Sequence, residues 1–425
     1  MAPIPTWPHQ SARAANPYGW LSAGPMAEGL NLGLSKMAEA TNTPVYFQLS
    51  HLSRWHVESD AINQALAMVI EAQSRLPMAK FWGGGVIASS DGQFFPAARQ
   101  GEAINLINAK YGSEPGLKAY THVSDQFGPF TTQNILATVS EAPYILDGLL
   151  MNNAGRKITE QYTDTGGFTD HVFAATSLLG IPFVPHIRDR PSKRLYLFDP
   201  ASAPDELRSL IGGKIRDGFI VQNWPGVLRS AATMVTIVMP PSQLLKKFAA
   251  YPRQHELAVA LREIGRVEHT LFTIEWILDA DMQRRAQIGL NKGEAHHALE
   301  NALRIERQDE IRDRTAEGQH YRMVGLNLLA AIIIYWNTKH LGQAVAARRR
   351  AGLSCAPDLL AHISPLGWAH ILLTGEYRLR GQTGECCEVI IPIVNTPLLP
   401  QLTRLDCSSR MSAASSSRAA THPAC

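Results

Sequence analysis

Three carboxylates occupy positions from which they could serve metal-dependent chemistry. Asp91 follows the β-rich segment GGGVIASS, and Asp164 follows ITEQYT. Strand ends commonly present catalytic groups, because the strand fixes the backbone while the next turn leaves the side chain accessible. Glu294 lies in a helical segment between Gly293 and Ala295, whose small size lets a bulky polyanion approach closely.

Carboxylates from two strands and one helix suit a hard divalent cation such as Mg²⁺, which binds carboxylate, water and phosphate oxygens. Two such ions about 3.5–4 Å apart can activate the attacking oxygen and stabilise the leaving oxygen in a displacement at phosphorus. The chain has 37 acidic residues, however, and an aspartate at a strand end is more often a turn or cap residue. Taken alone, the three residues favour a structural role over a catalytic one.

Three other aspartates compete for a role in this chemistry. Asp170 follows Thr169 at a predicted helix start, where a carboxylate satisfies free N–H groups, so we prefer Asp164 as the functional acid. Asp125 in HVSDQF lies within a predicted strand and could be structural or support a site. Asp147 in YILDGLL lies inside a predicted helix, which favours a solvated or paired surface acid.

Histidines and basic residues surround the acidic positions. His296 and His297 adjoin Glu294, but without a cysteine or an HExxH spacing, helix packing or phosphate contact explains them better than metal binding. His171 has the same ambiguity. Three basic residues close to Glu294 could contact DNA phosphates, and a solvated helix face explains them equally well: Lys292, Arg284 and Arg285.

The middle of the chain alternates between strand and helix patterns. Residues 30–79 are predicted to be helical, after a loose leader over the first 28 residues. The β-rich segments are 83–95, 116–139, 158–163 and 181–187, and the helices between them are 142–152 and 168–180. The order of three strands, helix, strand, helix and strand predicts a mixed sheet with helices on its faces.

The second half of the chain is mainly helical. Residues 190–250 resemble an insertion, and helices follow from Glu256, over 283–310 and over 322–347. Apolar residues at steps of three and four form a stripe that predicts a core-facing helix surface, together with Trp276: Ala260, Ile264, Val267, Leu271, Ile274 and Leu278. The tail after about Arg380 is rich in Ser, Ala, Pro and Cys and is predicted to be poorly ordered.

Composition indicates a folded protein of the cytoplasm. Apolar content is 45%, and the longest apolar run, Val324–Trp336, is shorter than the ~20 residues that span a bilayer. No secretory signal opens the chain. The five cysteines come late and form no CxxC pair, which argues against a disulfide framework or structural zinc. A net charge of +3 permits DNA binding without arguing for it.

Long motifs give the chain a family resemblance over about residues 30–380. They include SSDGQFF, INAKYGSEPG, YTHVSDQ, YILDGLL, YTDTGGFTDHVFA, AYPRQHELAVALREIGRVEHTLF, GLNKGEA, QHYRMVGLNLLAAIIIYWNT and SPLGWAHILLTGEY. In this order they resemble the catalytic region of Tn-three-type transposases, which belong to class II replicative bacterial transposons. Such a resemblance reverses the structural interpretation of the three carboxylates.

The resemblance implies an α/β fold with a ribonuclease H-like mixed sheet, flanking helices, a largely helical insertion before the last catalytic helix, and helical N- and C-terminal additions. It implies a DDE triad carried by motif: Asp91 in SSDGQ, Asp164 in YTDTGGFTDH and Glu294 in NKGEA, all three binding Mg²⁺ or Mn²⁺. The divisions expected are 1–80 (loose leader and helical N-terminal region), 81–190 (first part of the core), 191–280 (insertion), 281–380 (catalytic helix and C-terminal helices) and 381–425 (unmatched tail).

The activity implied is 3′-end cleavage and strand transfer on double-stranded DNA, that is, transposon ends and target. A homo-oligomer is a candidate assembly, and no membrane partner is expected. Family members carry long N-terminal DNA-binding regions, whereas nothing similar precedes Leu30 here, and the sequence departs from the family again after Arg380. These departures favour, as an alternative, a truncated and inactive remnant that only binds DNA. A general ribonuclease H-like nuclease is a third hypothesis.

Overall fold

The computed structural model describes residues 17–377, apart from 42–43, 98–104, 153–154, 156, 189–192, 251–254 and 306–309. The expected disorder of the tail 381–425 and the first 16 residues of the expected leader lie outside the described residues. So do four of the cysteines, whereas Cys355 is a half-buried free thiol. No described helix combines the length and apolar character needed to cross a membrane.

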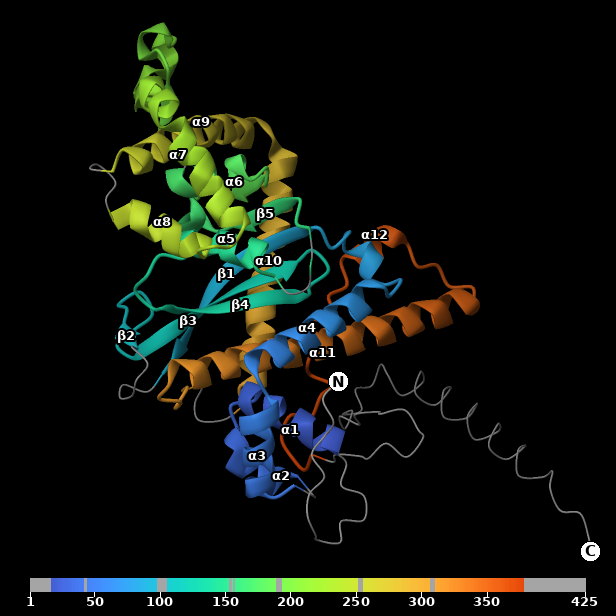
Figure 1. The fold of residues 1–425 in the computed structure, drawn as a ribbon. Coiled ribbons are helices and arrows are strands. Elements are labelled where there is room, and N and C mark those ends of the chain that lie inside the picture. Colours follow the sequence, from blue (N-terminus) through green and yellow to red (C-terminus); the bar gives the residue numbers. More distant parts are fainter. Residues whose placement is uncertain are drawn as a thin grey trace, which may run out of the picture.

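A mixed sheet forms the centre of the molecule, as the alternation of strand and helix patterns predicted (Figure 1). β1 pairs antiparallel with β3 and parallel with β5, β3 pairs antiparallel with β4 and β2, and β5 pairs parallel with β6. The strands are β1 (Ile87–Pro96), β2 (Leu106–Ile107), β3 (Pro115–Ser124), β4 (Pro129–Leu136), β5 (Glu160–Thr163) and β6 (Phe183–Pro185).

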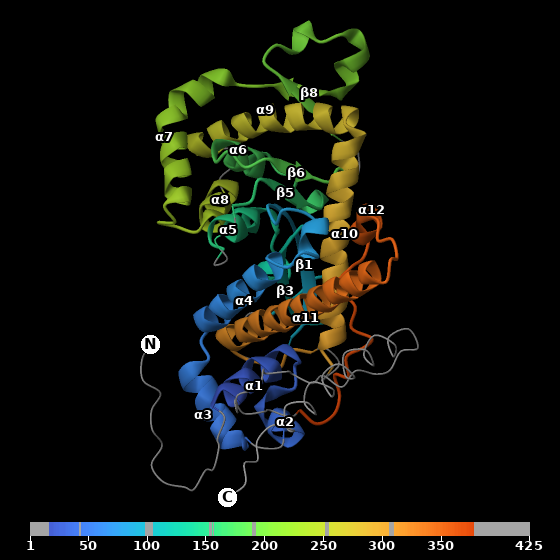
Figure 2. The ribbon, with the colours of Figure 1, turned by 90° about the vertical axis from the view of Figure 1, so that its right-hand side faces the viewer.

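Helices cover both faces of this sheet. Because side chains alternate along β1, Ala88 and Ser89 point to opposite faces. Ala88 joins a core cluster with α4 (Ser59–Ser74) and α11 (Ala316–Arg350). Ser89 faces α10 (Ala280–Leu303), and Figure 2 shows this long helix running beside the sheet.

Shorter helices connect the central strands. They are η1 (Ala79–Phe81), η2 (Ala142–Tyr144), α5 (Ile145–Leu150), η3 (Thr165–Gly167) and α6 (Asp170–Leu178). Asp125, expected within a strand, lies instead in the turn between β3 and β4, where the chain reverses direction.

The N-terminal region is helical from residue 17, so the loose leader expected over residues 1–28 is wrong for residues 17–28. The elements are α1 (Pro17–Gly29), α2 (Gly33–Ala40) and α3 (Tyr46–His56). At Gly29 a Cβ atom would lie 2.8 Å from the backbone of Gly325 on α11, so two glycines let the helices meet closely. Tertiary packing of this kind stabilises a helix whose own apolar periodicity is weak.

The chain between β6 and α10 forms a separate layer at one end of the molecule (Figures 1 and 2). Its elements are β7 (Leu195–Leu197), η4 (Pro200–Ser202), η5 (Asp205–Leu210), β8 (Ile211–Lys214), α7 (Asp217–Val235), α8 (Pro241–Ala250) and α9 (Glu256–Leu278). The chain after α11 adds α12 (Pro357–Ala361). α10 begins three residues before the predicted 283 and ends at Leu303.

The apolar stripe predicted to bury one side of α9 is partly wrong. Leu271, Ile274 and Leu278 are exposed, the last at 79%. The buried side contains Leu261, Phe272 and Trp276 instead, so the expectation for the tryptophan is confirmed. Both sides of α9 are apolar, and the neighbouring α6 decides which of them is buried, because Gly265 on that side allows the two helices to approach.

Candidate metal centre

The register of β1 and β5 places Asp91 beside Asp164. In the parallel pair, Ser90 lies opposite Thr163. Asp91 and Asp164 are the residues that come directly after this last pair, so the register brings both to the same end of β5. Asp91 lies in the middle of β1, not at a strand end as the sequence indicated, but β5 stops beside it. This shorter neighbour leaves one side of Asp91 open.

α10 brings Glu294 to the same face of β1. A Cβ atom at Gly289 would lie 2.4 Å from the Tyr162 ring on β5, and one at Gly293 would lie 3.9 Å from Ser89 Oγ. Gly289 therefore lets the helix lie close against the sheet, whereas a Cβ atom at Gly293 would make an ordinary contact. Gly293 itself is buried. Glu294 itself is exposed.

A candidate metal-binding group results from this packing. Among the described residues, it consists of Asp91, Glu294 and His297, whose potential ligand atoms all lie within 4.8 Å of one another. Asp164 lies outside this tight group, yet its charge contributes to raising the pKa of Asp91. Two predicted ligands are thus brought together with a third that was not predicted, and Asp164 directly follows the adjoining strand β5.

The two neighbouring histidines point in different directions. His297 Nδ1 lies 3.9 Å from Asp91 Oδ2. His296 turns away, and its Nε2 lies 3.3 Å from Glu300 Oε1 inside the contact with α11. Burial lowers the pKa of His297, so the ring is neutral near pH 7 and can offer a nitrogen lone pair. Its position three residues after Glu294, on the same side of a helix, was the signal for this role.

Asp91 has an unusual affinity for a proton. Burial, together with the charges of Asp164, Glu141 and Glu294, raises its pKa to about 7, although a hydrogen bond from the Gly92 amide opposes this shift. Negative charges gathered around one carboxylate in this way can be neutralised by a bound cation as well as by a proton. The donor set therefore fits a divalent ion.

Glu141 is a fourth carboxylate that sequence reasoning missed. Its Oε1 accepts a hydrogen bond from Lys118 Nζ at 2.7 Å, and both side chains are largely buried. A Cβ atom at Gly92 would lie 2.6 Å from the carboxyl group of Glu141. The ion pair therefore occupies the space directly beside the Asp91 backbone and depends on glycine at position 92.

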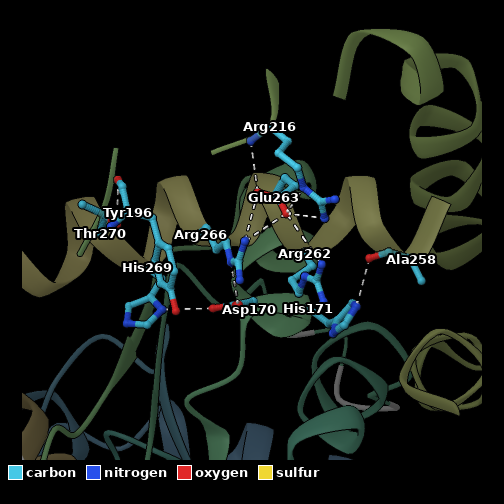
Figure 3. Close-up of polar contacts among 10 residues, drawn as sticks. All are labelled: Asp170, His171, Tyr196, Arg216, Ala258, Arg262, Glu263, Arg266, His269 and Thr270. Carbon is cyan, nitrogen blue, oxygen red and sulfur yellow. Dashed lines mark hydrogen bonds and ion pairs between the residues drawn. The ribbon is translucent and has the colours of Figure 1, made fainter. Parts of the chain in front are cut away.

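The competing Asp170 is engaged in the contact between α6 and α9 (Figure 3). Its Oδ1 lies 3.0 Å from His269 Nδ1, and its Oδ2 lies 3.8 Å from Arg266 Nε. His171 also turns to α9, with Nε2 3.2 Å from the Ala258 carbonyl oxygen. These contacts give both α6 residues structural roles.

Asp147 is not the surface acid that its helical position suggested. It is 4% exposed, and its Oδ1 accepts a hydrogen bond from the Ser242 amide at 2.7 Å. The carboxylate thereby satisfies an amide of the first turn of α8, as an acid near a helix start does.

The basic residues near Glu294 differ in accessibility. Lys292 Nζ donates to the carbonyl oxygen of Trp82 at 3.3 Å and to that of Asp125, so its predicted contact with DNA phosphate is not favoured. Burial also lowers the pKa of Lys292. Arg284 is exposed and pairs with Asp281 at 2.8 Å. Arg285 is also exposed.

Comparison with known proteins places this chain in a family. Residues 8–377 match the family model described as the Tn3 transposase DDE domain. The chain belongs to this family. It is 45% identical over 352 residues to the transposase for transposon Tn501 of Pseudomonas aeruginosa, and 45% identical over 355 residues to that for Tn21 of Escherichia coli. It is 32% identical over 370 residues to the transposase for transposon gamma-delta of Escherichia coli strain K12.

These matches cover most of the Tn3-family chain but a minor part of its relatives. The first two cover 83% and 84% of this chain and 36% of each relative, and the third covers 86% and 37%. The chain therefore spans about 36% of the length of these two curated relatives. The family is the one that the motifs indicated.

The pKa of Asp91 predicts how pH affects metal binding at the candidate DDE site. A cation must displace the proton from Asp91 below about pH 7, so we expect affinity for Mn²⁺ to fall up to about tenfold per pH unit below that value. Without metal, the pH dependence of stability that Asp91 causes has the opposite sign to that of a usual carboxylate, whose pKa is lowered by folding. The folded chain holds the proton more tightly than the unfolded one, whose value is near 3.8, so stability falls as pH rises from about 4 to about 7.

Calorimetric titration with Mn²⁺ and thermal unfolding in chelator, both between pH 5 and pH 8, would measure these two effects. The Asp91→Asn variant should lose the contribution of this residue to both pH dependences. Equal pH dependence in the variant and the natural chain would contradict the assignment.

Gly92→Ala is expected to destabilise the fold by about 1–3 kcal/mol, because the added methyl group must displace Glu141 from Lys118. Denaturant unfolding would measure the change. Gly84→Ala is the matched control, since its Cβ atom would make an ordinary contact with Val86 at 3.5 Å. Adding Glu141→Ala should make the two substitutions clearly non-additive, whereas simple additivity would rule out the clash.

Proposed function

We propose that this chain carries the catalytic site for DNA strand cleavage and strand transfer in transposition, with Asp91, Asp164 and Glu294 as its DDE triad. The observation that carries the proposal is the convergence of Asp91 and Glu294 within one candidate metal group, with Asp164 directly after the last residue of the adjoining strand β5. The names of the relatives support it, since they are transposases.

Both reaction steps are displacements at phosphorus. In cleavage, water attacks the phosphorus at a transposon end, the bond from phosphorus to the 3′ oxygen breaks, and that oxygen takes a proton. In transfer, the freed 3′-hydroxyl attacks a target phosphodiester, whose own 3′ oxygen leaves. No oxidation occurs, and one bond to phosphorus replaces another in each step. One site can therefore serve both steps.

The position of each residue would set its role in the site. Asp91, Asp164 and Glu294 would hold Mg²⁺ or Mn²⁺, and His297 would add a neutral nitrogen beside them. A bound divalent ion would supply charge stabilisation at the reacting phosphate. The Lys118–Glu141 pair fixes the backbone side of Asp91, and Gly289 lets α10, which carries Glu294, lie close to Tyr162 on β5.

The strand order supports a ribonuclease H-like architecture for this site. From one edge the order is β4, β3, β1, β5 and β6, with β3 antiparallel to its neighbours and β5 and β6 parallel to β1. We further propose that residues 191–280 are an insertion between the core, 81–190, and the catalytic helix that opens 281–380. Between β6 and α10 the described chain adds β7 and β8 as a separate two-stranded sheet, together with α7, α8 and α9.

Incubation of the purified chain with labelled transposon-end duplex and supercoiled plasmid tests the proposal. We expect nicking and joining of the duplex into plasmid with Mg²⁺ or Mn²⁺, and loss of both in chelator. Cleavage of an RNA–DNA hybrid without any strand joining would indicate a general nuclease. DNA binding without any cleavage would indicate the inactive remnant.

A further inference from the structure

α3 exposes large aromatic side chains at the end of the molecule opposite α7 and α9 (Figures 1 and 2). Phe47 is 81% exposed, Trp55 is 65% exposed and Tyr46 is 45% exposed. Single apolar residues on a surface are ordinary, but a gathering of exposed aromatic rings on one element commonly marks a binding surface.

The rings share one side of α3 with a permanent cation. Phe47, His51, Arg54 and Trp55 follow the helical spacing i, i+4, i+7 and i+8, and we call these four residues the α3 face. Leu49 lies on the opposite side and is buried in the core with α1 and α2, so the α3 face points away from that core.

A capping hydrogen bond holds the first turn of α3, the helix that carries these side chains. Gln48 Oε1 accepts a hydrogen bond from the Val45 amide at 3.0 Å, which closes the first turn of α3. The ring centroids of His51 and Trp55 lie 6.4 Å apart, and those of Tyr46 and Phe47 lie 5.7 Å apart. Phe47 thus borders Tyr46 and Trp55 borders His51, while both Phe47 and Trp55 remain largely exposed to solvent.

The charge on this helix has one sign. Between Val45 and Val57 the sequence contains Arg54 and two histidines, His51 and His56, and neither Asp nor Glu. Open aromatic rings stack on nucleic acid bases without sequence preference, and neighbouring cations pair with backbone phosphates. A protein partner of acidic character would match the charge but would not require several open rings.

From these observations we propose that the α3 face binds unpaired DNA bases by stacking on Phe47 and Trp55, while Arg54 contacts phosphate. Bases inside a duplex are hidden from such rings, so the ligand is single-stranded or branched DNA. This assignment of DNA rests on the proposed function. Strand transfer joins one strand at each junction, and its product is therefore a branched molecule that can present unpaired bases.

Fluorescence anisotropy with a labelled 20-nucleotide oligo(dT) and a blunt-ended, fully paired duplex of matched length tests the inference in chelator, where catalysis is absent. Stacking is worth about 1–3 kcal/mol per base, so we expect about a tenfold loss of oligo(dT) affinity for each of Phe47→Ala and Trp55→Ala. Duplex affinity should change by less than about threefold. Arg54→Ala should lower the salt dependence of binding by about one ion.

Met68→Ala on α4 is the matched control, because Met68 is 72% exposed but neither aromatic nor charged, and this variant should bind oligo(dT) like the natural chain. Trp55→Phe should keep most of the affinity. Unchanged oligo(dT) affinity in the Phe47→Ala/Trp55→Ala double variant would overturn the inference. If the double variant lost only self-association and kept its oligo(dT) affinity, the inference would also be overturned, because the α3 face would then be a protein contact.

Failure here and failure of the proposed function have different signatures. A chain that binds oligo(dT) through the α3 face but never cleaves DNA with Mg²⁺ would keep this inference and refute the function. A chain that cleaves DNA but binds oligo(dT) equally well without the two rings would do the reverse.

Discussion

Asp91→Asn is expected to reduce metal-dependent DNA cleavage by about 1,000-fold, with little change in size or fold. Asparagine keeps the shape of the side chain but removes the charge that a divalent ion would bind. Asp91 is also the residue on which the charges of Asp164, Glu141 and Glu294 converge. Nicking of supercoiled plasmid with Mg²⁺ at pH 8 would measure the loss.

The matched control for this variant is Asp281→Asn. Asp281 belongs to α10, like Glu294, but is exposed and pairs with Arg284 on the helix surface. We expect this control to cleave at the natural rate, since an exposed ion pair contributes little. Full cleavage by Asp91→Asn, with the control also active, would refute the catalytic role of Asp91.

Glu263→Gln is expected to lower the free energy of unfolding by about 3 kcal/mol, the lower end for breaking a buried ion pair. The Glu263 side chain is fully buried. Its Oε1 lies 3.0 Å from both Arg216 Nη2 and Arg266 Nη1, and 3.7 Å from Arg262 Nη2 (Figure 3). Glutamine would leave three partly buried guanidinium groups without the charge that they surround.

The cluster matters because it joins α9 to the start of α7, where the Arg216 amide also donates to Glu263 Oε2 at 3.2 Å. Denaturant unfolding would measure the effect, with Glu275→Gln on the exposed side of α9 as the control. A change below about 0.5 kcal/mol in Glu263→Gln, the range of ordinary surface substitutions, would show that the arginines do not depend on this carboxylate.

The central sheet could be predicted because its signals are local. The β-rich segments are bounded by Gly, Pro or Asn, and the helices between them have their own start and stop residues, such as Gly180 after α6, which has a positive φ of 66°. The order of elements then restricts the sheet to a mixed one. Only the register, which puts Asp91 beside Asp164, had to come from the structure.

The buried side of α9 could not be predicted from its own sequence. Leu261, Phe272 and Trp276 form one apolar side, and Leu271 and Ile274 contribute to another. Periodicity finds both, but the close approach of α6 at Gly265 selects the first, because a Cβ atom at that position would lie 1.7 Å from the Asp170 carbonyl oxygen. Such a contact depends on residues about a hundred positions apart.

The residues around the candidate site were also hard to predict from the sequence. Motifs indicated Asp91, Asp164 and Glu294, and spacing put His297 on the side of the helix that carries Glu294, but no sequence signal placed Glu141 next to Asp91. His297 reaches Asp91 because Gly289 lets α10 lie close to Tyr162 on the sheet, and Glu141 reaches it because Lys118 on β3 holds its carboxylate. Both arrangements arise from packing between distant segments, which residue spacing does not encode.

Anomalous diffraction from crystals soaked in Mn²⁺ tests the central claim most directly, because it locates the ion independently of activity. We predict an anomalous peak about 2.0–2.2 Å from carboxylate oxygens of Asp91, Asp164 and Glu294, the usual range for small divalent cations. A peak coordinated by Asp91, Glu294 and His297 without Asp164, or no peak at this site, would contradict the shared coordination.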